Sequence, residues 1–225
     1  TNRRLIVGEQ IGVDIRSAAG VTSTLLNAPG AAIESVLGPG VRGGDGDDRV
    51  ENHGIISSAA NMAVALGAGN DELLLDTNAR LGGTIDGGSG IDTLALAGSG
   101  VLALDLTTTN GFERLRKQDA GGWRLLGSGD MSWTVEAGQL AVDGAVSGAG
   151  AVRPGATLSG TGVVGGFVNQ GAVAPGNSIG TLRVSGNYEQ QATGTLVIDA
   201  SIVSGFADRL EVAGQAVIKG GAIAV

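Results

Sequence analysis

A repeat of roughly 20 residues is the feature that most constrains this chain. Three segments each join a glycine loop to an acidic residue and then to an apolar run: GGDGDDRVE from Gly43, LGAGNDELLL from Leu66 and GGSGIDTLAL from Gly87. When Asp48, Asp71 and Asp92 are aligned, their separations are 23 and 21 residues. A period of this length is typical of solenoids, in which each repeat forms one coil and stacked coils share a core.

The segments between these loops predict strands. Runs such as MAVAL, LLLD and TLALAG are short, apolar and bounded by Gly, Asn or Asp. A helix is disfavoured because apolar residues do not recur at i, i+3, i+4 and i+7, and because each glycine in a helix costs about 1 kcal/mol relative to alanine. With 42 glycines in 225 residues, we expect an all-β chain: a parallel β-helix of about ten coils.

Composition restricts the partners. The net charge is −8 and the pI is near 4.5, so nucleic acid and anionic membranes are disfavoured as partners. Cysteine is absent, which excludes disulfides and thiolate metal sites. No apolar run approaches the ~18 residues needed to cross a membrane, and residues 1–30 lack the pattern of a signal peptide. We expect this chain to be a piece of a longer protein.

The first glycine–aspartate loop fits a calcium-binding pattern. In G-G-x-G-x-D-x-U-x, where U is a large apolar residue, the fixed positions are matched by Gly43, Gly44, Gly46, Asp48 and Val50. In calcium-binding β-rolls the motif occurs in tandem, and stacked loops hold the ion between glycine carbonyls and aspartates. Here the motif comes once per coil, so half of the expected partners are missing.

Two interpretations of these loops therefore stay open. The favoured one is a tight turn, in which glycine supplies a positive φ and aspartate accepts a bond from an amide two residues further on. The other is a calcium site, which would make calcium the one cofactor. Its ligands would be Asp45, Asp48, Asp71 and Asp92.

Other motifs do not assemble a catalytic set. GNSIG, residues 176–180, satisfies G-x-S-x-G, but Ser178 is followed by a strand pattern, and the one histidine, His53, lies upstream of it, against the order of that fold's triad. GTGVVG, residues 160–165, satisfies G-x-G-x-x-G without a helix after it. We interpret His53 as a turn residue. Stacked acids could also form a glycosidase-like pair, a weaker hypothesis that involves Asp45, Asp47, Asp48, Asp71 and Asp92. We expect no enzymatic activity from this chain.

The second half contains an ordered series of pieces: GFERL, WRLLG, GQLAVDG, GATLSGTGVVGG, GAVAPGNSIGTLRVSGNY and DRLEV. This series closely resembles the C-terminal end of the passenger domain of classical bacterial autotransporters, including its autochaperone region. The resemblance covers roughly residues 111–225. The first half is similar to autotransporter passengers and equally to other repeat-rich surface proteins.

The resemblance implies a right-handed β-helix at the bacterial cell surface or secreted, whose C-terminal coils fold first. It divides the chain into coils with Gly/Asp-rich loops, residues 1–110, and autochaperone-like coils, residues 111–225. In the family this region is covalently followed by an outer-membrane barrel, so we expect no direct membrane insertion by this segment.

The function expected from the resemblance is that of a non-enzymatic stalk and folding platform, with adhesion or self-association in a virulence context. Its partner would be a host or bacterial surface protein or glycan, or another copy. The alternatives are a passenger with a lyase, esterase or protease domain upstream, and a module that binds a host protein through residues 16–42 or 116–122.

Aromatic and leucine positions predict where packing is tightest. All six aromatic residues lie in the second half: Phe112, Trp123, Trp133, Phe167, Tyr188 and Phe206. Aromatic side chains bury the largest apolar area, so we expect the tightest core there. Leu182, Leu196 and Leu210 follow one another at intervals of 14 residues, which suggests that they share one packing role.

Overall fold

The computed structural model describes residues 1–225 and is built almost entirely of short strands. Its only helix is a single 3₁₀ turn, η1 (Leu106–Thr108). None of its helical structure is long and apolar enough to span a membrane. The chain divides into two compact units, one of residues 1–98 with 108–115 and the other of residues 99–107 with 116–225.

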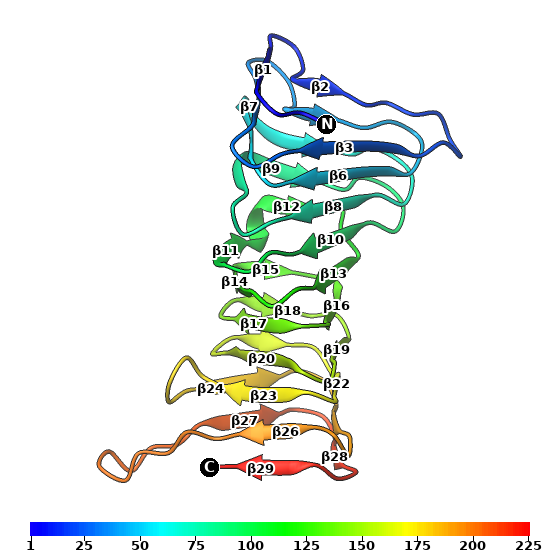
Figure 1. The fold of residues 1–225 in the computed structure, drawn as a ribbon. Helices are drawn as coiled ribbons and strands as arrows, with labels where there is room; N and C mark the ends of the chain where they lie inside the picture. Colours follow the sequence, from blue (N-terminus) through cyan, green and yellow to red (C-terminus); the bar gives the residue numbers. More distant parts are fainter. The chain divides into compact units, whose positions relative to one another are not determined.

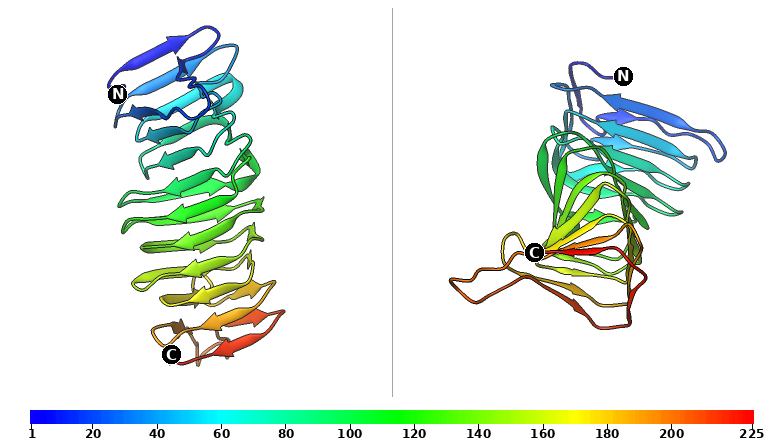
Figure 2. Two further views of the ribbon diagram at one scale, coloured as in Figure 1. Left: turned by 90° about the vertical axis from the view of Figure 1, so that its right-hand side faces the viewer. Right: turned by 60° about the horizontal axis from the view of Figure 1, so that its bottom comes forward.

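The strands of each coil pair in parallel with their equivalents in the next coil, which confirms the predicted all-β parallel solenoid (Figures 1 and 2). The register confirms the predicted period, because Arg49 pairs with Glu72 and Thr93 pairs with Glu72, which are steps of 23 and 21 residues. The solenoid makes about eight turns, slightly fewer than the ten expected. Coil length is not constant: the step from Ser23 to Asp48 is 25 residues, whereas that from Trp133 to Gly150 is 17.

The first unit has two ladders of strands. One follows the order β3 (Ser23–Asn27), β6 (Asp48–Asn52), β8 (Glu72–Leu75) and β10 (Thr93–Leu96). The other contains β1 (Leu5–Gly8), β2 (Val13–Asp14), β4 (Ala32–Ser35), β5 (Val41–Arg42), β7 (Ile55–Ala65), β9 (Arg80–Asp86) and β12 (Thr109–Asn110). The division between the units falls within strand β13 (Arg114–Lys117), after residue 115.

The second unit has three ladders. The first contains β16 (Ser132–Val135), β19 (Gly150–Val152), β22 (Phe167–Asn169), β25 (Tyr188–Gln190) and β28 (Ala216–Ile218). The second contains β11 (Val101–Asp105), β14 (Gly122–Leu126), β17 (Gly138–Val142), β20 (Ala156–Gly160), β23 (Ala172–Pro175), β26 (Thr195–Val197) and β29 (Ala222–Ala224). The third contains β15 (Ser128–Gly129), β18 (Ala145–Val146), β21 (Val163–Val164), β24 (Thr181–Val184) and β27 (Arg209–Val212).

Aliphatic residues stack in register inside the first unit. Leu25, Val50, Leu73 and Leu94 pair one above another on successive coils, and all four are buried. Burying such a side chain contributes roughly 1.5–3 kcal/mol. Each coil therefore adds one apolar layer to the same column.

An aromatic column lies inside the second unit. Trp133, Gly150, Phe167 and Tyr188 pair in sequence on successive coils. The Phe167 ring lies 5.4 Å from that of Trp133 and 5.1 Å from that of Tyr188, tilted in both cases. A Cβ on Gly150 would lie 2.0 Å from the Trp133 indole, so the indole fills the space above this glycine. These burials support the expected aromatic core.

Two packing predictions need correction. Phe206 is 69% exposed, so it does not contribute to the core. Leu182 pairs with Leu210 in one ladder, whereas Leu196 pairs with Val173 in another. The interval of 14 residues is therefore not one structural period, because the coil that joins Leu182 to Leu210 spans both intervals.

Candidate functional site: the stacked glycine–aspartate loops

The three glycine–aspartate loops lie one above another in the first unit. Their glycines approach the backbone of the preceding coil so closely that a side chain would not fit. A Cβ on Gly67 would lie 2.3 Å from the Gly44 carbonyl oxygen, and one on Gly88 would lie 1.9 Å from that of Gly67. Gly67 and Gly88 also have positive φ values, 108° and 100°. Glycine is therefore required by the stacking of coils as well as by the turn.

The aspartates that follow these glycines form a buried column. Asp48, Asp71 and Asp92 are each exposed by 1% or less. The Asp48 amide donates to Asp71 Oδ1 at 2.6 Å, and the Asp71 amide donates to Asp92 Oδ1 at 2.7 Å. The Asp92 amide in turn donates to Glu113 Oε2 at 2.8 Å. Each carboxylate therefore links its own coil to the one before it.

This arrangement differs from the turn that the sequence suggested. The expected donor to an aspartate carboxylate was an amide two residues further on, but Asp71 and Asp92 accept from amides of the previous coil. Asp48 differs again, because its oxygens accept from the Ser17 hydroxyl at 2.9 Å and from the Gly44 amide at 2.8 Å. The stacked backbone puts these amides within reach, and the local sequence does not show this.

The four predicted calcium ligands do not gather at one point. Asp48, Asp71 and Asp92 share the buried column, whereas Asp45 is exposed. No three or more His, Cys, Asp or Glu side chains lie together in a metal-binding arrangement. Asp47, from the weaker glycosidase-like hypothesis, is also exposed and accepts from the Asn70 amide. Whether the loops bind calcium stays a prediction.

Two carboxylate oxygens in the column are buried and accept no hydrogen bond: Asp71 Oδ2 and Asp92 Oδ2. Burial, the largest effect, raises the pKa of Asp71 to about 7; the Asp48 amide opposes this rise, and the neighbouring Asp92 and Asp48 carboxylates add to it. Burial also raises the pKa of Asp92, and Glu113 and Asp86 contribute to the rise. The column therefore favours a bound proton or another positive charge.

A second polar column was not predicted. The side-chain amide of Asn2 donates to Asn27 Oδ1 at 2.9 Å, and that of Asn27 donates to Asn52 Oδ1 at 2.8 Å. Asn27 and Asn52 are fully buried. The only signal in the sequence is the separation of 25 residues between successive asparagines, which is the length of one coil.

The catalytic-looking motifs have ordinary surroundings. Ser178 lies in a turn after β23 with φ 152°, beside a hollow of about 530 Å³ that Asp199 and Asp208 also line. Both Asp208 oxygens are occupied by the amides of Gly180 and Asp199. His53 lies in the first unit, 3.7 Å from Asp76 and 3.9 Å from Glu51. The motif GTGVVG contains strand β21 and is followed by strand β22, which confirms that no helix follows it.

Two apolar surfaces in the second unit were also missed. Residues 199–208 form a hairpin closed by an antiparallel bridge between Ala200 and Ala207. Its tip exposes 100% of Ile202, 95% of Val203 and 69% of Phe206. The hairpin projects beyond the strands on either side of it (Figure 1).

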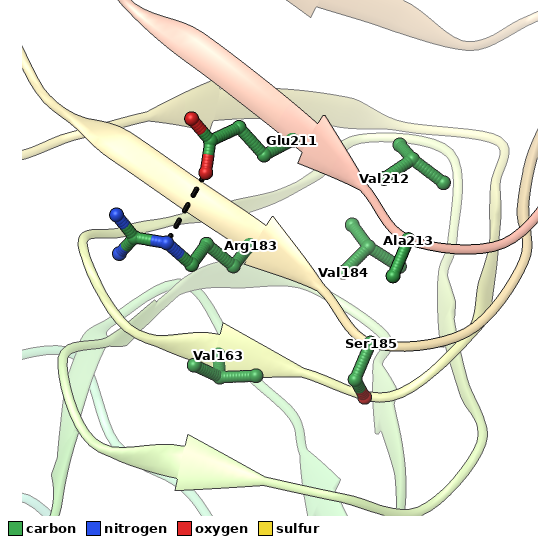
Figure 3. Close-up of a pocket in the computed structure, with 7 residues that line it drawn as sticks. All are labelled: Val163, Arg183, Val184, Ser185, Glu211, Val212 and Ala213. Atoms are coloured by element: carbon green, nitrogen blue, oxygen red, sulfur yellow. Dashed lines mark ion pairs between the residues drawn. The ribbon is translucent and has the colours of Figure 1, made fainter.

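A shallow groove of about 340 Å³ lies on the ladder that β27 closes (Figure 3). It is lined mainly by apolar atoms from Val163, Val184, Val212 and Ala213. An ion pair of 3.2 Å between Arg183 and Glu211 borders it. The hairpin precedes the first residue of β27, and the groove is lined by its last residues, so the tip and the groove are separate surfaces.

Comparison with known proteins gives one partial similarity. No protein-family model matches the chain, and no solved structure matches it. Over 81 residues it is 44% identical to the extracellular serine protease of Serratia marcescens. The match covers 33% of this chain and 8% of that protein. The chain therefore spans a small part of the relative's length.

Proposed function

We propose that this chain is a segment of an autotransporter passenger, secreted or held at the bacterial surface, which acts as a non-enzymatic β-helical stalk. The observation that carries the proposal is the in-register parallel stacking of coils within both units. The bonds between coils run along the stacking direction, so each coil supports the next through its backbone. The partial similarity to an extracellular protein supports a location outside the cell.

The second unit is proposed to be the folding platform. Its aromatic column of Trp133, Phe167 and Tyr188 buries large apolar surfaces on neighbouring coils. Each coil that docks on it would bury further apolar area and pair an open strand edge. Folding of this unit would therefore favour outward movement of a chain crossing the outer membrane, without an ATP source.

A surface-display experiment tests the platform. The chain is placed between a secretion signal and an outer-membrane barrel in a Gram-negative host, and surface-exposed protein is quantified with antibody on intact cells. We expect Trp133→Ala to lower the surface amount several-fold and Phe206→Ala, an aromatic truncation at an exposed site, to leave it unchanged. Equal surface amounts for a destabilised Trp133→Ala variant and the parent would contradict the platform.

Self-association is the more specific role that the hairpin favours. Its tip presents three large apolar side chains to solvent, a feature that soluble surfaces normally avoid when it has no partner. The apolar groove beside Val184 and Val212 offers a concave surface of matching chemistry on a second copy. Because tip and groove are different surfaces, this contact would join copies head to tail.

Sedimentation velocity over a range of concentrations tests this role. We expect concentration-dependent association of the parent, which is lost in an Ile202→Ser, Phe206→Ser double variant. Val101→Ser is the matched control, because Val101 is 81% exposed on the same unit but lies in β11. A parent that stays monomeric at high micromolar concentration would exclude the proposed contact.

The alternative is a passenger whose enzymatic domain lies upstream. Among the enzyme classes considered, the partial similarity to an extracellular serine protease favours a protease domain over a lyase or an esterase. Under both proposals the coils described here serve as the stalk. Assays of peptide hydrolysis, ester hydrolysis and polysaccharide cleavage on this chain and on the longer protein distinguish them, because the alternative predicts activity in the longer protein alone.

A further inference from the structure

The unpaired carboxylate oxygens of Asp71 and Asp92 need a positive partner. Both side chains are almost fully buried, and Oδ2 of each accepts no hydrogen bond. A buried carboxylate oxygen without a partner is strongly unfavourable, and native proteins seldom leave one. Such an atom indicates a missing ligand when the same feature recurs on adjacent coils.

Asp48 is the internal comparison. It occupies the same place in the preceding coil, but its two oxygens are bound by the Ser17 hydroxyl and the Gly44 amide. Asp71 and Asp92 each have only Oδ1 bound, by the amide of the preceding coil. The unpaired oxygens therefore belong to the two neighbouring coils that carry Asp71 and Asp92. The coil that carries Asp48 has none in this column.

The surroundings are rich in oxygen and negative in charge. The Gly111 carbonyl oxygen and Asp92 Oδ2 lie 2.1 and 3.0 Å from the point that a Cβ on Gly87 would occupy. The charged groups with the largest effects on the two carboxyls are all acidic: Asp47, Asp48, Asp86, Asp92 and Glu113. Carboxylate and carbonyl oxygens gathered in this way suit a hard cation.

We propose that Asp71 Oδ2 and Asp92 Oδ2 mark a site for one calcium ion between adjacent coils of the first unit. Two carboxylates are fewer than a calcium ion's usual six to eight oxygen ligands, so backbone carbonyls of the glycine loops and water supply the rest. Irregular loop carbonyls fit calcium better than magnesium, which demands octahedral geometry. Asp45 and Asp48 are not ligands of this site. The inference does not depend on the proposed stalk.

Isothermal titration calorimetry on the metal-free whole chain tests the site directly. We expect CaCl₂ to bind and MgCl₂ to bind at least tenfold more weakly. Asp92→Asn and Asp71→Asn remove calcium binding, whereas Asp45→Asn, an equal charge change at an exposed position of the first loop, retains it. Absence of calcium binding by the parent, equal binding of magnesium, or unchanged binding by Asp92→Asn would each overturn the proposal.

Thermal melts separate lost binding from lost folding. In chelator, Asp92→Asn is expected to melt at or above the temperature of the parent, because the amide removes an unpaired buried charge. Calcium then raises the melting temperature of the parent and of Asp45→Asn but not that of Asp92→Asn. A calcium-induced rise in Asp92→Asn equal to that in the parent would show that the ion binds elsewhere.

Discussion

The two units specify the stacking of their coils in different ways. The first unit lines its interior with polar columns, Asp48–Asp71–Asp92 and Asn2–Asn27–Asn52, beside aliphatic residues. The second unit uses the aromatic column that begins at Trp133. Polar columns fix register because a shifted coil would lose its hydrogen bonds, whereas aromatic columns contribute burial. The first unit is therefore expected to be sensitive to pH and ions, and the second to truncation of its core.

Truncating the aromatic column should have the largest effect. Trp133 is 2% exposed, and its indole occupies the space above Gly150. We expect Trp133→Ala to lower the free energy of unfolding of the second unit by about 3–5 kcal/mol, measured by urea denaturation. Phe206→Ala, at an exposed position, should change it by less than ~0.5 kcal/mol. Equal effects of the two variants would mean that the column does not stabilise this unit.

The free energy of unfolding should change with pH in opposite directions in the two units. The pKa of Asp71 is raised by burial from 3.8 to about 7, so the folded first unit binds this proton more tightly than the unfolded chain does. In the presence of chelator, the contribution of Asp71 to the free energy of unfolding of the first unit is therefore greatest below pH ~4. It falls by up to about 4 kcal/mol as the pH rises to 7. Urea denaturation between pH 4 and pH 8 measures this fall, which Asp71→Asn should remove.

Asp143 in the second unit supplies the contrast. Burial favours its neutral form, but hydrogen bonds from the Thr161 amide and from Asn177 and Arg124 outweigh burial and lower its pKa. Its contribution is present above the unfolded pKa and is lost as the pH falls through the lower, folded value. A first unit whose stability also falls on acidification from pH 7 to 4 would contradict the proposed difference.

Two glycines with positive φ distinguish the effect of close stacking between coils from the effect of turn geometry. Gly88 has φ 100°, and a Cβ there would lie 1.9 Å from the Gly67 carbonyl oxygen. Gly20 also has a positive φ, 78°, but a Cβ there would meet nothing within 4 Å. We expect Gly88→Ala to cost about 2–4 kcal/mol and Gly20→Ala about 1–2 kcal/mol, measured by urea denaturation. Similar costs would show that backbone conformation alone requires these glycines.

The sequence predicted the features that depend on its own period. The spacing of Asp48, Asp71 and Asp92 gave the coil length, and glycine loops between apolar runs gave parallel strands. The segment GFERLRK, residues 111–117, likewise contains a strand, β13. These predictions succeed because a solenoid repeats one local pattern and each repeat places equivalent residues at equivalent positions.

What the sequence did not show depends on contacts between coils. The carboxylates of Asp71 and Asp92 accept from amides 23 and 21 residues away, so turn rules for neighbouring residues gave the wrong donor. The asparagine column had too few members to stand out as a repeat. Phe206 was predicted to pack because aromatic residues usually do, but the hairpin of residues 199–208 leaves the coil and carries it into solvent.

Substitutions in the asparagine column should have the smallest effects on the free energy of unfolding, and the effect should depend on position in the column. Asn27 donates to Asn52 and to the Ile55 carbonyl and accepts from Asn2, so Asn27→Leu removes one hydrogen bond from each of these three residues. Asn52 ends the column, because Leu75 takes the equivalent position on the next coil, and its own side-chain nitrogen has no partner. Replacing it with leucine removes that unpaired group, which offsets part of the loss. We expect costs of about 2–3 kcal/mol for Asn27→Leu and about 1 kcal/mol or less for Asn52→Leu, measured by urea denaturation. A larger cost for Asn52→Leu would show that the column is held from its Asn52 end, and that hydrogen bonds between asparagines are not what fixes the register of the first unit.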